Sequence, residues 1–229
     1  MITPFLDRHD AGTQIAAELQ AYSHRPDVLV LALPRGGVPV GYEVARALGA
    51  PLDVLVVRKL GVPGHEELAM GAVASGGVRV LQDDVIRELG IPPSTVDIVT
   101  EAETRELERR ERAYRGRRPM RDVRGKTVIV VDDGMATGST MRAAVAALRL
   151  QHPKRIVVAV PVAARSACEA MRELADECVC VRAAEPFYAV GLWYRDFTPT
   201  LDAEVRALLA AAATPPAATT SPATTTSPT

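Results

Sequence analysis

Hydrophobic positions in this chain fall into two patterns that alternate along its length. Continuous apolar runs of strand length predict buried strands at residues 28–33, 53–57, 127–132, 155–161 and 178–181. Apolar residues spaced by three or four positions predict helices at residues 10–23, 40–48, 139–150 and 164–175. Strands that are apolar throughout, alternating with amphipathic helices, are typical of a parallel sheet covered on both faces. We therefore predict an α/β fold with a central parallel sheet flanked by helices.

The middle of the chain interrupts this alternation. Residues 61–77 are rich in glycine and small side chains, and short strands are expected at 71–74 and 78–81. Residues 97–118 predict a charged helix inserted into the domain. Its acids and arginines recur four positions apart, which favours ion pairs between Glu101 and Arg105, Glu106 and Arg110, and Glu108 and Arg112. A solvated helix face explains this alternation of charge better than a nucleic-acid surface does.

Composition limits the number of domains and the kinds of partner that can be expected. The 229 residues are 48% hydrophobic, enough for one sizeable core and too few for two full-size domains. We expect one domain at residues 1–210 and a disordered, low-complexity tail at 211–229. With 27 basic and 28 acidic residues, the overall charge gives no reason to expect nucleic acid as a partner. No apolar run is long enough to span a membrane and the N-terminus does not resemble a signal peptide, so we expect a cytoplasmic protein without a membrane partner.

Three predicted strand ends carry unusual residues. Pro34-Arg35-Gly36-Gly37 follows the first strand, Arg58-Lys59 follows the second, and Asp132-Asp133-Gly134 begins the loop after a later one. Because the carboxyl ends of parallel strands meet at one edge of a sheet, all three segments are expected to lie together. Lysine occurs only at three positions among the 27 cations, which makes Lys59 more noticeable than an arginine would be.

Residues 134–140, GMATGST, predict a tight turn that opens a helix. Backbone N–H groups of small residues can approach an oxyanion closely, and the helix N-terminus adds positive potential. The spacing differs from a Walker A loop, and no GxGxxG fingerprint is present. Asp132 and Asp133, expected at a solvent-facing strand end, would repel a phosphate but suit ribose hydroxyls or waters on Mg²⁺. A ribose 5-phosphate site is therefore favoured over a plain Asp-Asp-Gly turn before a capped helix.

Residues 128–140, VIVVDDGMATGST, resemble the 5-phosphoribosyl 1-pyrophosphate (PRPP) signature of the type I phosphoribosyltransferases. The segment at 34–37 is similar to that family's pyrophosphate loop, and Arg58-Lys59 resembles the Arg-Lys pair of its orotate-type and adenine-type members. RKLGVPGHEELAMGAV, which begins at Arg58, looks like a group of bacterial phosphoribosyltransferase-like proteins. The resemblance covers roughly residues 10–205. It implies the type I phosphoribosyltransferase fold with a small C-terminal hood at 185–197 and a mobile lid loop, for which 61–77 is our candidate and a surface hairpin the equal alternative.

The resemblance also implies roles for single residues. Asp132 and Asp133 would bind the ribose 2- and 3-hydroxyls and hold Mg²⁺ through water. The 5-phosphate would be held by Ala136, Thr137, Gly138, Ser139 and Thr140. Pyrophosphate would be bound by Arg35, Gly36, Gly37, Arg58 and Lys59. Arg58 and Lys59, with the two aspartates, are the predicted catalytic residues.

The acceptor side is less defined. Residues 185–197 are similar to the segment around Val-Gly in hypoxanthine–guanine members, and three aromatic residues there could stack a base or simply pack the C-terminal helix: Phe187, Tyr188 and Trp193. Ala136 stands where those purine enzymes carry an acid. Its Ala-Thr-Gly context looks more like the adenine-type signature, so the acceptor stays open.

The function implied is Mg²⁺-dependent transfer of 5-phosphoribosyl from PRPP to a nitrogenous base or amine, with release of pyrophosphate. Displacement at C1 passes through an oxocarbenium-like state, for which charge stabilisation of the leaving group and orientation of the ribose are the main needs. A PRPP- or nucleotide-sensing regulator on the same fold is the alternative. Phosphoribosyl hydrolysis is a weaker third, and a homodimer is compatible with the sequence.

Overall fold

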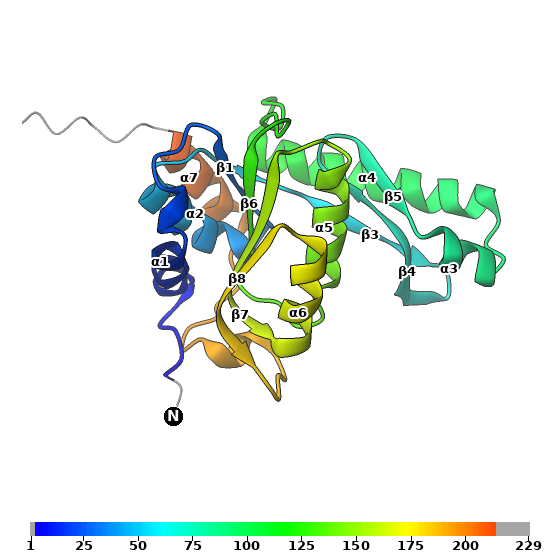
Figure 1. Ribbon diagram of the computed structural model, residues 1–229. Coiled ribbons are helices and arrows are strands. Elements are labelled where there is room, and N and C mark those ends of the chain that lie inside the picture. Colours follow the sequence, from blue (N-terminus) through cyan, green and yellow to red (C-terminus); the bar gives the residue numbers. More distant parts are fainter. Residues whose placement is uncertain (1–2, 214–229) are drawn as a thin grey trace, which may run out of the picture.

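The computed structural model describes residues 3–213, which form two sheets and the helices around them (Figure 1). The strands are β1 (Val28–Ala32), β2 (Leu52–Val54), β3 (Val57–Val62), β4 (His65–Ala74), β5 (Val78–Leu81), β6 (Thr127–Val131), β7 (Arg155–Ala164) and β8 (Glu177–Ala184). The helices are α1 (Arg8–Glu18), α2 (Gly37–Leu48), α3 (Asp83–Glu88), α4 (Pro93–Arg115), α5 (Ser139–Arg149), α6 (Arg165–Leu174) and α7 (Asp202–Ala213), with short 3₁₀ turns η1 (Gln20–Tyr22) and η2 (Val190–Trp193).

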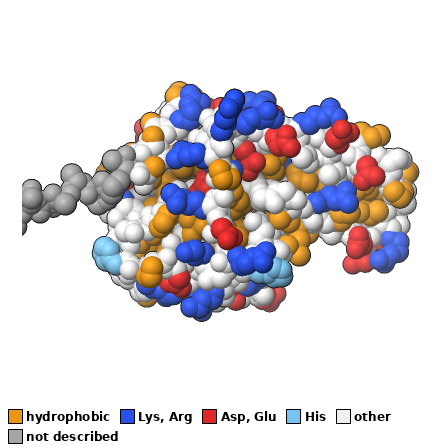
Figure 2. Space-filling model, turned by 90° about the horizontal axis from the view of Figure 1, so that it is seen from above, with side chains coloured by type: hydrophobic (Ala, Val, Ile, Leu, Met, Phe, Trp, Pro, Cys, Tyr) orange, Lys and Arg blue, Asp and Glu red, His pale blue; other side chains and the backbone are white. Residues whose placement is uncertain are grey.

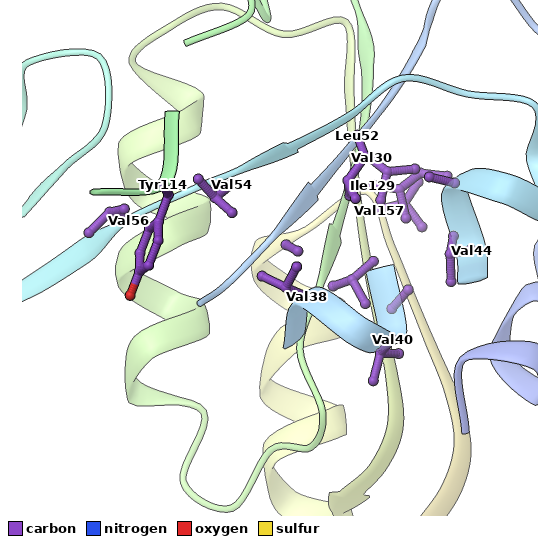
Figure 3. Close-up of a cluster of buried hydrophobic side chains, with 14 of the residues drawn as sticks. Val30, Val38, Val40, Val44, Leu52, Val54, Val56, Tyr114, Ile129 and Val157 are labelled. Atoms are coloured by element: carbon purple, nitrogen blue, oxygen red, sulfur yellow. The ribbon is translucent and has the colours of Figure 1, made fainter. Parts of the chain in front are cut away.

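The larger sheet is parallel throughout and has the strand order β2-β1-β6-β7-β8. Helices α1, α2 and α7 pack on one face, and α5 and α6 on the other (Figure 1). Successive strand residues enter opposite cores: Val30 and Ile129 pack on the α2 side, whereas Leu31 and Val130 pack on the α5 side. Figure 3 shows the first of these cores, with Val44 of α2 among its labelled side chains. The predicted parallel α/β fold is therefore confirmed.

The second predicted strand is wrong as a single element. The apolar run 53–57 divides into β2, which belongs to the parallel sheet, and the start of β3, which opens an antiparallel sheet of order β3-β4-β5. This smaller sheet lies between α4 and α5 (Figure 1). Residues 71–74 and 78–81 are strands as predicted, and 61–77 is for the most part the β3–β4 hairpin, whose role as a lid stays a proposal.

A buried arginine joins the two sheets. Arg115, at the end of α4, donates from Nε to Oδ1 of Asp53 on β2 at 2.9 Å. Its Nη2 donates to the carbonyl oxygen of Val54 at 2.9 Å and to Oγ of Ser75, just beyond β4, at 3.0 Å. Both charged side chains are less than one-tenth exposed, so Asp53 depends on Arg115 for its neutralisation, and Arg115 is neutralised by Asp53 together with Glu111.

Helix α4 is the predicted charged helix, displaced by a few residues from the predicted bounds of 97–118 because Pro93 can open a helix and Gly116 ends it. All three expected pairs form along it: Glu101–Arg105, Glu106–Arg110 and Glu108–Arg112. The acids of this helix thus neutralise its arginines, as the sequence predicted.

The C-terminal end of the domain is a helix. α7 continues to Ala213, so the tail predicted to begin at Ala211 starts at least three residues too early, and its remainder, 214–229, lies outside the described residues. Val205 and Leu209 of this helix are buried in the α2-side core, which explains why the helix is retained beyond residue 210. Within the described part of the chain, no helix is both long and apolar enough to cross a membrane.

Candidate functional site

The loops that follow β1 and β6 are in contact at the carboxyl edge of the parallel sheet. A Cβ atom on Gly36 would overlap Oδ2 of Asp133, and one on Gly37 would lie 2.8 Å from the carbonyl oxygen of Val131. Real Cβ atoms do not come this close, so only glycine fits at these positions. The loop at residues 34–37, here called the PRGG loop, therefore closes directly on the acidic pair Asp132 and Asp133.

The acidic pair is more enclosed than a solvent-facing strand end would make it. Burial raises the pKa of both carboxyls, and the negative charge of Asp133 raises that of Asp132 further. At Asp133 the guanidinium of Arg8 opposes this rise. The backbone N–H of Asp133 also donates to Oδ1 of Asp132 at 2.9 Å, which fixes the first carboxylate against its own loop.

Arg8 is a site residue that the sequence pattern does not reveal. Its Nε donates to Oδ2 of Asp133 at 2.8 Å, and its Nη1 donates to the carbonyl oxygen of Thr198 at 2.8 Å. The guanidinium lies 3.9 Å from the ring centroid of Phe197 and the residue is buried. Tyr194 adds a second support, because its hydroxyl donates to the carbonyl oxygen of Asp133 at 2.5 Å. The first turn of α1 and the hood thus hold the second aspartate from two sides.

The loop at residues 136–140, here called the phosphate loop, presents small groups to solvent. Met135 anchors it, since its backbone pairs with β7 and its side chain is buried. Gly138 adopts a left-handed conformation, φ 73°, and caps the start of α5. The hydroxyls of Thr137 and Ser139 lie 3.0 Å apart. Ala136, Thr137, Ser139 and Thr140 are exposed, so the loop can present both backbone donors and hydroxyls to an anion.

The two cationic side chains of β3 that were predicted to bind pyrophosphate do not both lie near the phosphate loop. Arg58 and Lys59 lie within β3 rather than at the end of β2, and adjacent strand residues face opposite sides. Arg58 turns to α4, where its Nε lies 2.6 Å from Oε2 of Glu103. Lys59 instead lines a cleft of about 390 Å³ together with Ser139 and Thr140. The expectation that three strand ends share one edge is therefore wrong for Arg58, whereas Lys59, from a different sheet, shares a cleft with the start of α5.

Arg35 is the second residue of the PRGG loop, but its side chain points away from the acidic pair and pairs with α7. Its Nη1 lies 3.6 Å from Oδ1 of Asp202, in the first turn of α7, and both side chains are about half exposed. Tyr114 of α4 donates a hydrogen bond to the same carboxylate oxygen at 3.2 Å. A pyrophosphate at the PRGG loop would thus have to compete with Asp202 for the charge of Arg35.

The hood lies against the signature loop. A Cβ atom on Gly134 would lie 2.5 Å from Cγ1 of Val190, so this glycine lets η2 pack directly on the loop. Phe187 and Trp193 stack on each other, with ring centroids 6.2 Å apart and planes 11° apart. Tyr188 is 81% exposed. In this conformation two of the three candidate stacking rings pack within the hood, and the third extends into solvent.

The acidic pair suits a metal ion that takes its remaining ligands from substrate and water. Within the described residues, no group of three or more His, Cys, Asp or Glu side chains could hold a metal ion by itself. Mg²⁺ usually binds through one or two carboxylates, substrate oxygens and retained waters. Asp132 and Asp133 provide that number of carboxylates next to a loop suited to phosphate.

A model of the phosphoribosyl transferase domain family matches residues 64–190, which include the signature at 128–140. The chain belongs to this family. The match begins after the PRGG loop and Lys59, so the assignment of these residues to the site depends on the structure and the sequence pattern.

Relatives of this phosphoribosyl transferase family member agree with the assignment. The Mycobacterium tuberculosis protein named "Putative phosphoribosyl transferase Rv0571c" is 47% identical over 208 residues, which make up 91% of this chain and 47% of that protein. The chain thus spans about half the length of the curated relatives it matches at this level. The "Bifunctional protein PyrR" of Chloroflexus aurantiacus is 35% identical over 132 residues, 55% of this chain and 65% of that protein.

Among solved structures, the protein TT1426 from Thermus thermophilus has the same fold with a TM-score of 0.82. It is 41% identical, and the alignment covers 90% of this chain and 98% of that one. The correspondence therefore extends over most of this chain and nearly all of that one.

Proposed function

We propose that this protein transfers 5-phosphoribosyl from PRPP to a nitrogenous base or amine, with Mg²⁺ as cofactor and pyrophosphate as the leaving group. The observation that carries the proposal is the contact of the PRGG loop with the acidic pair, beside an exposed phosphate loop. This arrangement brings together diol acceptors, backbone donors and hydroxyl donors within one edge of the sheet, which are the groups that a phosphorylated ribose requires.

The acidic pair would orient the ribose. Ionised carboxylates accept hydrogen bonds from vicinal hydroxyls, and such charge-assisted bonds are stronger than neutral ones. Asp133 is held by Arg8, and Asp132 by the backbone N–H of its neighbour, so both acceptors are positioned before the sugar arrives. Because little covalent help is needed, this positioning would contribute directly to the rate.

The PRGG loop and Lys59 would receive the leaving group. As the bond from C1 to the pyrophosphate oxygen breaks, the acceptor nitrogen forms its bond to C1 and negative charge builds on pyrophosphate. Asp132 and Asp133 would hold Mg²⁺ through water, and the ion would supply positive charge that neutralises part of that negative charge. Lys59 lies on the β3–β4 hairpin, so the same segment could bring a cation and exclude water over the site.

A PRPP- or nucleotide-sensing regulator remains the second candidate, and one observation favours it. Both arginines expected at the pyrophosphate are paired with acids, Arg35 with Asp202 and Arg58 with Glu103. A protein that only recognises a ribose 5-phosphate has no need of them at the site. Lys59, which lines the same cleft as Ser139 and Thr140, argues in the other direction.

The deciding experiment measures PRPP binding and turnover on the same preparations. We expect PRPP to bind in the presence of MgCl₂, and Asp132→Asn with Asp133→Asn to weaken binding by about 1–3 kcal/mol. Asp83 and Asp84 offer a matched control, since they are also adjacent acids but are exposed on α3. A screen of bases and amines would then follow pyrophosphate release.

The outcomes separate the candidates. Pyrophosphate release with at least one acceptor supports the transferase. PRPP or nucleotide binding that needs the acidic pair, without release for any acceptor, supports the regulator. If neither PRPP nor ribose 5-phosphate binds, or the acidic-pair variant binds as well as wild type, the ribose 5-phosphate site is wrong.

A further inference from the structure

A second charged surface lies at the opposite edge of the parallel sheet. Between α4 and β6 the chain runs without regular structure, and residues 117–124, here called the arginine loop, carry Arg117, Arg118, Arg121 and Arg124. All four are exposed. Figure 2 views the molecule from this side and shows Lys and Arg side chains more widely spread over it than Asp and Glu. The overall balance of charge hides this local excess of cations.

The arginine loop differs from the helix that precedes it. The arginines of α4 are matched by acids of the same helix, for example Arg105 by Glu101 at 2.7 Å and Arg109 by Glu106 at 2.7 Å. Within the described residues, none of the four loop arginines forms an ion pair. Four positive charges thus face solvent without a counter-ion from the protein.

The nearby acids are already engaged. Asp122, the loop's own acid, accepts the backbone N–H of Arg124 at 2.9 Å. Asp53 is buried under Arg115 and accepts the backbone N–H of Arg121 at 3.0 Å. Glu111 lies 3.0 Å from Nη1 of Arg115. The loop itself thus carries four positive charges against the one negative charge of Asp122, an excess of cations.

The surroundings leave space for an extended partner. An open groove of about 490 Å³ runs beside the loop and is lined in part by Arg117 and Arg118. Gly77 and Gly116 also line it, and at both a Cβ atom would meet nothing within 4 Å. The acids that line the groove, Glu108 and Glu111, are paired with Arg112 and Arg115, so among the described residues its unpaired cations are Arg117 and Arg118.

We propose that the arginine loop binds the phosphodiester backbone of duplex nucleic acid without reading its sequence. Four unpaired arginines suit successive phosphates, because a guanidinium binds phosphate with two parallel donors. The loop has no aromatic residue on which an unpaired base could stack, so a duplex is favoured over a single strand. This inference is independent of the transferase proposal.

The two surfaces can be occupied together. The arginine loop precedes β6 and the acidic pair follows it, so the five residues of this strand separate them by about 16 Å. Binding of duplex at one edge would not cover the other. Ribose 5-phosphate is therefore expected to leave duplex affinity unchanged at constant ionic strength.

The test is fluorescence anisotropy with a labelled 20-base-pair duplex, prepared once as DNA and once as RNA of the same sequence. We expect binding at 50 mM KCl, and a plot of log K against log salt with a slope of about −3 to −4, as four phosphate contacts predict. Replacing all four loop arginines by glutamine should lower affinity at least tenfold and bring the slope near zero, on the same counter-ion argument. The DNA and RNA arms show which duplex is preferred.

The matched control replaces Arg105 and Arg109, which are exposed but ion-paired, by glutamine; their loss should change affinity less than twofold. Arg121→Gln with Arg124→Gln tests the idea with a smaller change, and melting curves check that each variant folds. The proposal fails if neither duplex binds, or if the loop variant and the α4 control bind alike. It also fails if phosphatidylserine vesicles bind in an arginine-dependent way and the duplexes do not.

Discussion

Arg8 and Asp133 form an ion pair of 2.8 Å although 125 positions separate them in the chain. Both side chains are mostly enclosed, 10% and 15% exposed. The pair joins the first turn of α1 to the loop after β6, and the same guanidinium also contacts the hood at the ring of Phe197 and donates to the carbonyl oxygen of Thr198, just beyond it. One arginine thus fixes three parts of the candidate site relative to one another.

Arg8→Gln should destabilise the fold and the site together. Removing one partner leaves the carboxylate of Asp133 buried without a counter-ion, which typically costs about 3–5 kcal/mol at full burial and less here because some exposure remains. We therefore expect a loss of about 2–3 kcal/mol in the free energy of unfolding and weaker ribose 5-phosphate binding. Urea denaturation and calorimetry measure these two quantities.

A double-mutant cycle shows whether the pair itself is responsible. Arg8→Gln with Asp133→Asn should cost less than the sum of the single changes, because no uncompensated charge remains. Arg105→Gln is the control, since its pair with Glu101 is about 70% exposed on both sides and should contribute under 1 kcal/mol. Strict additivity in the cycle would show that Arg8 acts through packing alone.

The raised pKa of Asp132 predicts how stability depends on pH. Because burial holds this pKa above the value in the unfolded chain, the folded protein retains the proton to higher pH. Between the two pKa values the folded state binds more protons, so the free energy of unfolding falls as pH rises through that window. Asparagine cannot ionise. Asp132→Asn should therefore melt higher than wild type at pH 7, and the difference should shrink toward pH 3, below the ordinary carboxyl pKa.

Ligand affinity should respond in the opposite direction. The diol needs ionised carboxylates, so affinity for ribose 5-phosphate should fall as pH drops through the raised pKa of the acidic pair. Thermal melts and calorimetry across pH 4–8 would measure both effects. A melting temperature of Asp132→Asn below that of wild type at pH 7 would contradict the charge-burial account.

Gly36→Ala tests the close approach of the two loops. The backbone of Gly36 has φ −60° and ψ −32°, which alanine adopts readily, so the change is opposed by the close contacts of the added Cβ with Asp133 and, at 3.2 Å, with Nε of Arg8. We expect a loss of about 1–3 kcal/mol in unfolding free energy, as for other overpacked sites, and impaired ribose 5-phosphate binding. Gly77→Ala is the counterpart: it meets open space but has φ 72°, so it should cost about 1–2 kcal/mol through backbone strain and leave binding intact.

The sequence predicted the parallel sheet well because its strands are apolar on both faces. The run at 28–33 and strand β1 differ by one residue, as do the run at 127–132 and β6. The failure at 53–57 has a physical cause. Leu55 and Val56, between β2 and β3, are as buried as β2 and continue its apolar run into Val57 of β3, so hydropathy does not mark where the chain leaves one sheet for another.

The sequence predicted those parts of the candidate site whose residues are adjacent in the chain. It did not predict contributions from residues that are far apart in the chain. The acidic pair, the phosphate loop and the PRGG loop are contiguous segments, and the structure brings them together. Arg8 stands alone near the N-terminus, and no spacing relates it to Asp133. Arg58-Lys59 forms one cationic unit in the sequence, yet strand geometry sends the two side chains to opposite faces.

The opposite orientations of Arg58 and Lys59 lead to the last prediction, which is that their substitutions affect turnover differently. Arg58 and Glu103 are each about a quarter exposed, so Arg58→Ala should cost about 1 kcal/mol of stability or less and little turnover. Lys59 would act on charge that grows as the bond to C1 breaks, so its contribution belongs to the transition state. For Lys59→Ala we expect turnover to fall roughly 10²–10³-fold, the effect of removing one oxyanion donor, with nucleotide monophosphate affinity nearly unchanged.

Turnover with an acceptor from the screen and calorimetry with the nucleotide, on both variants, provide the comparison. If Arg58→Ala lost turnover and Lys59→Ala did not, the hairpin would have to turn its other face to the pyrophosphate, and the Glu103 pair would open during the reaction.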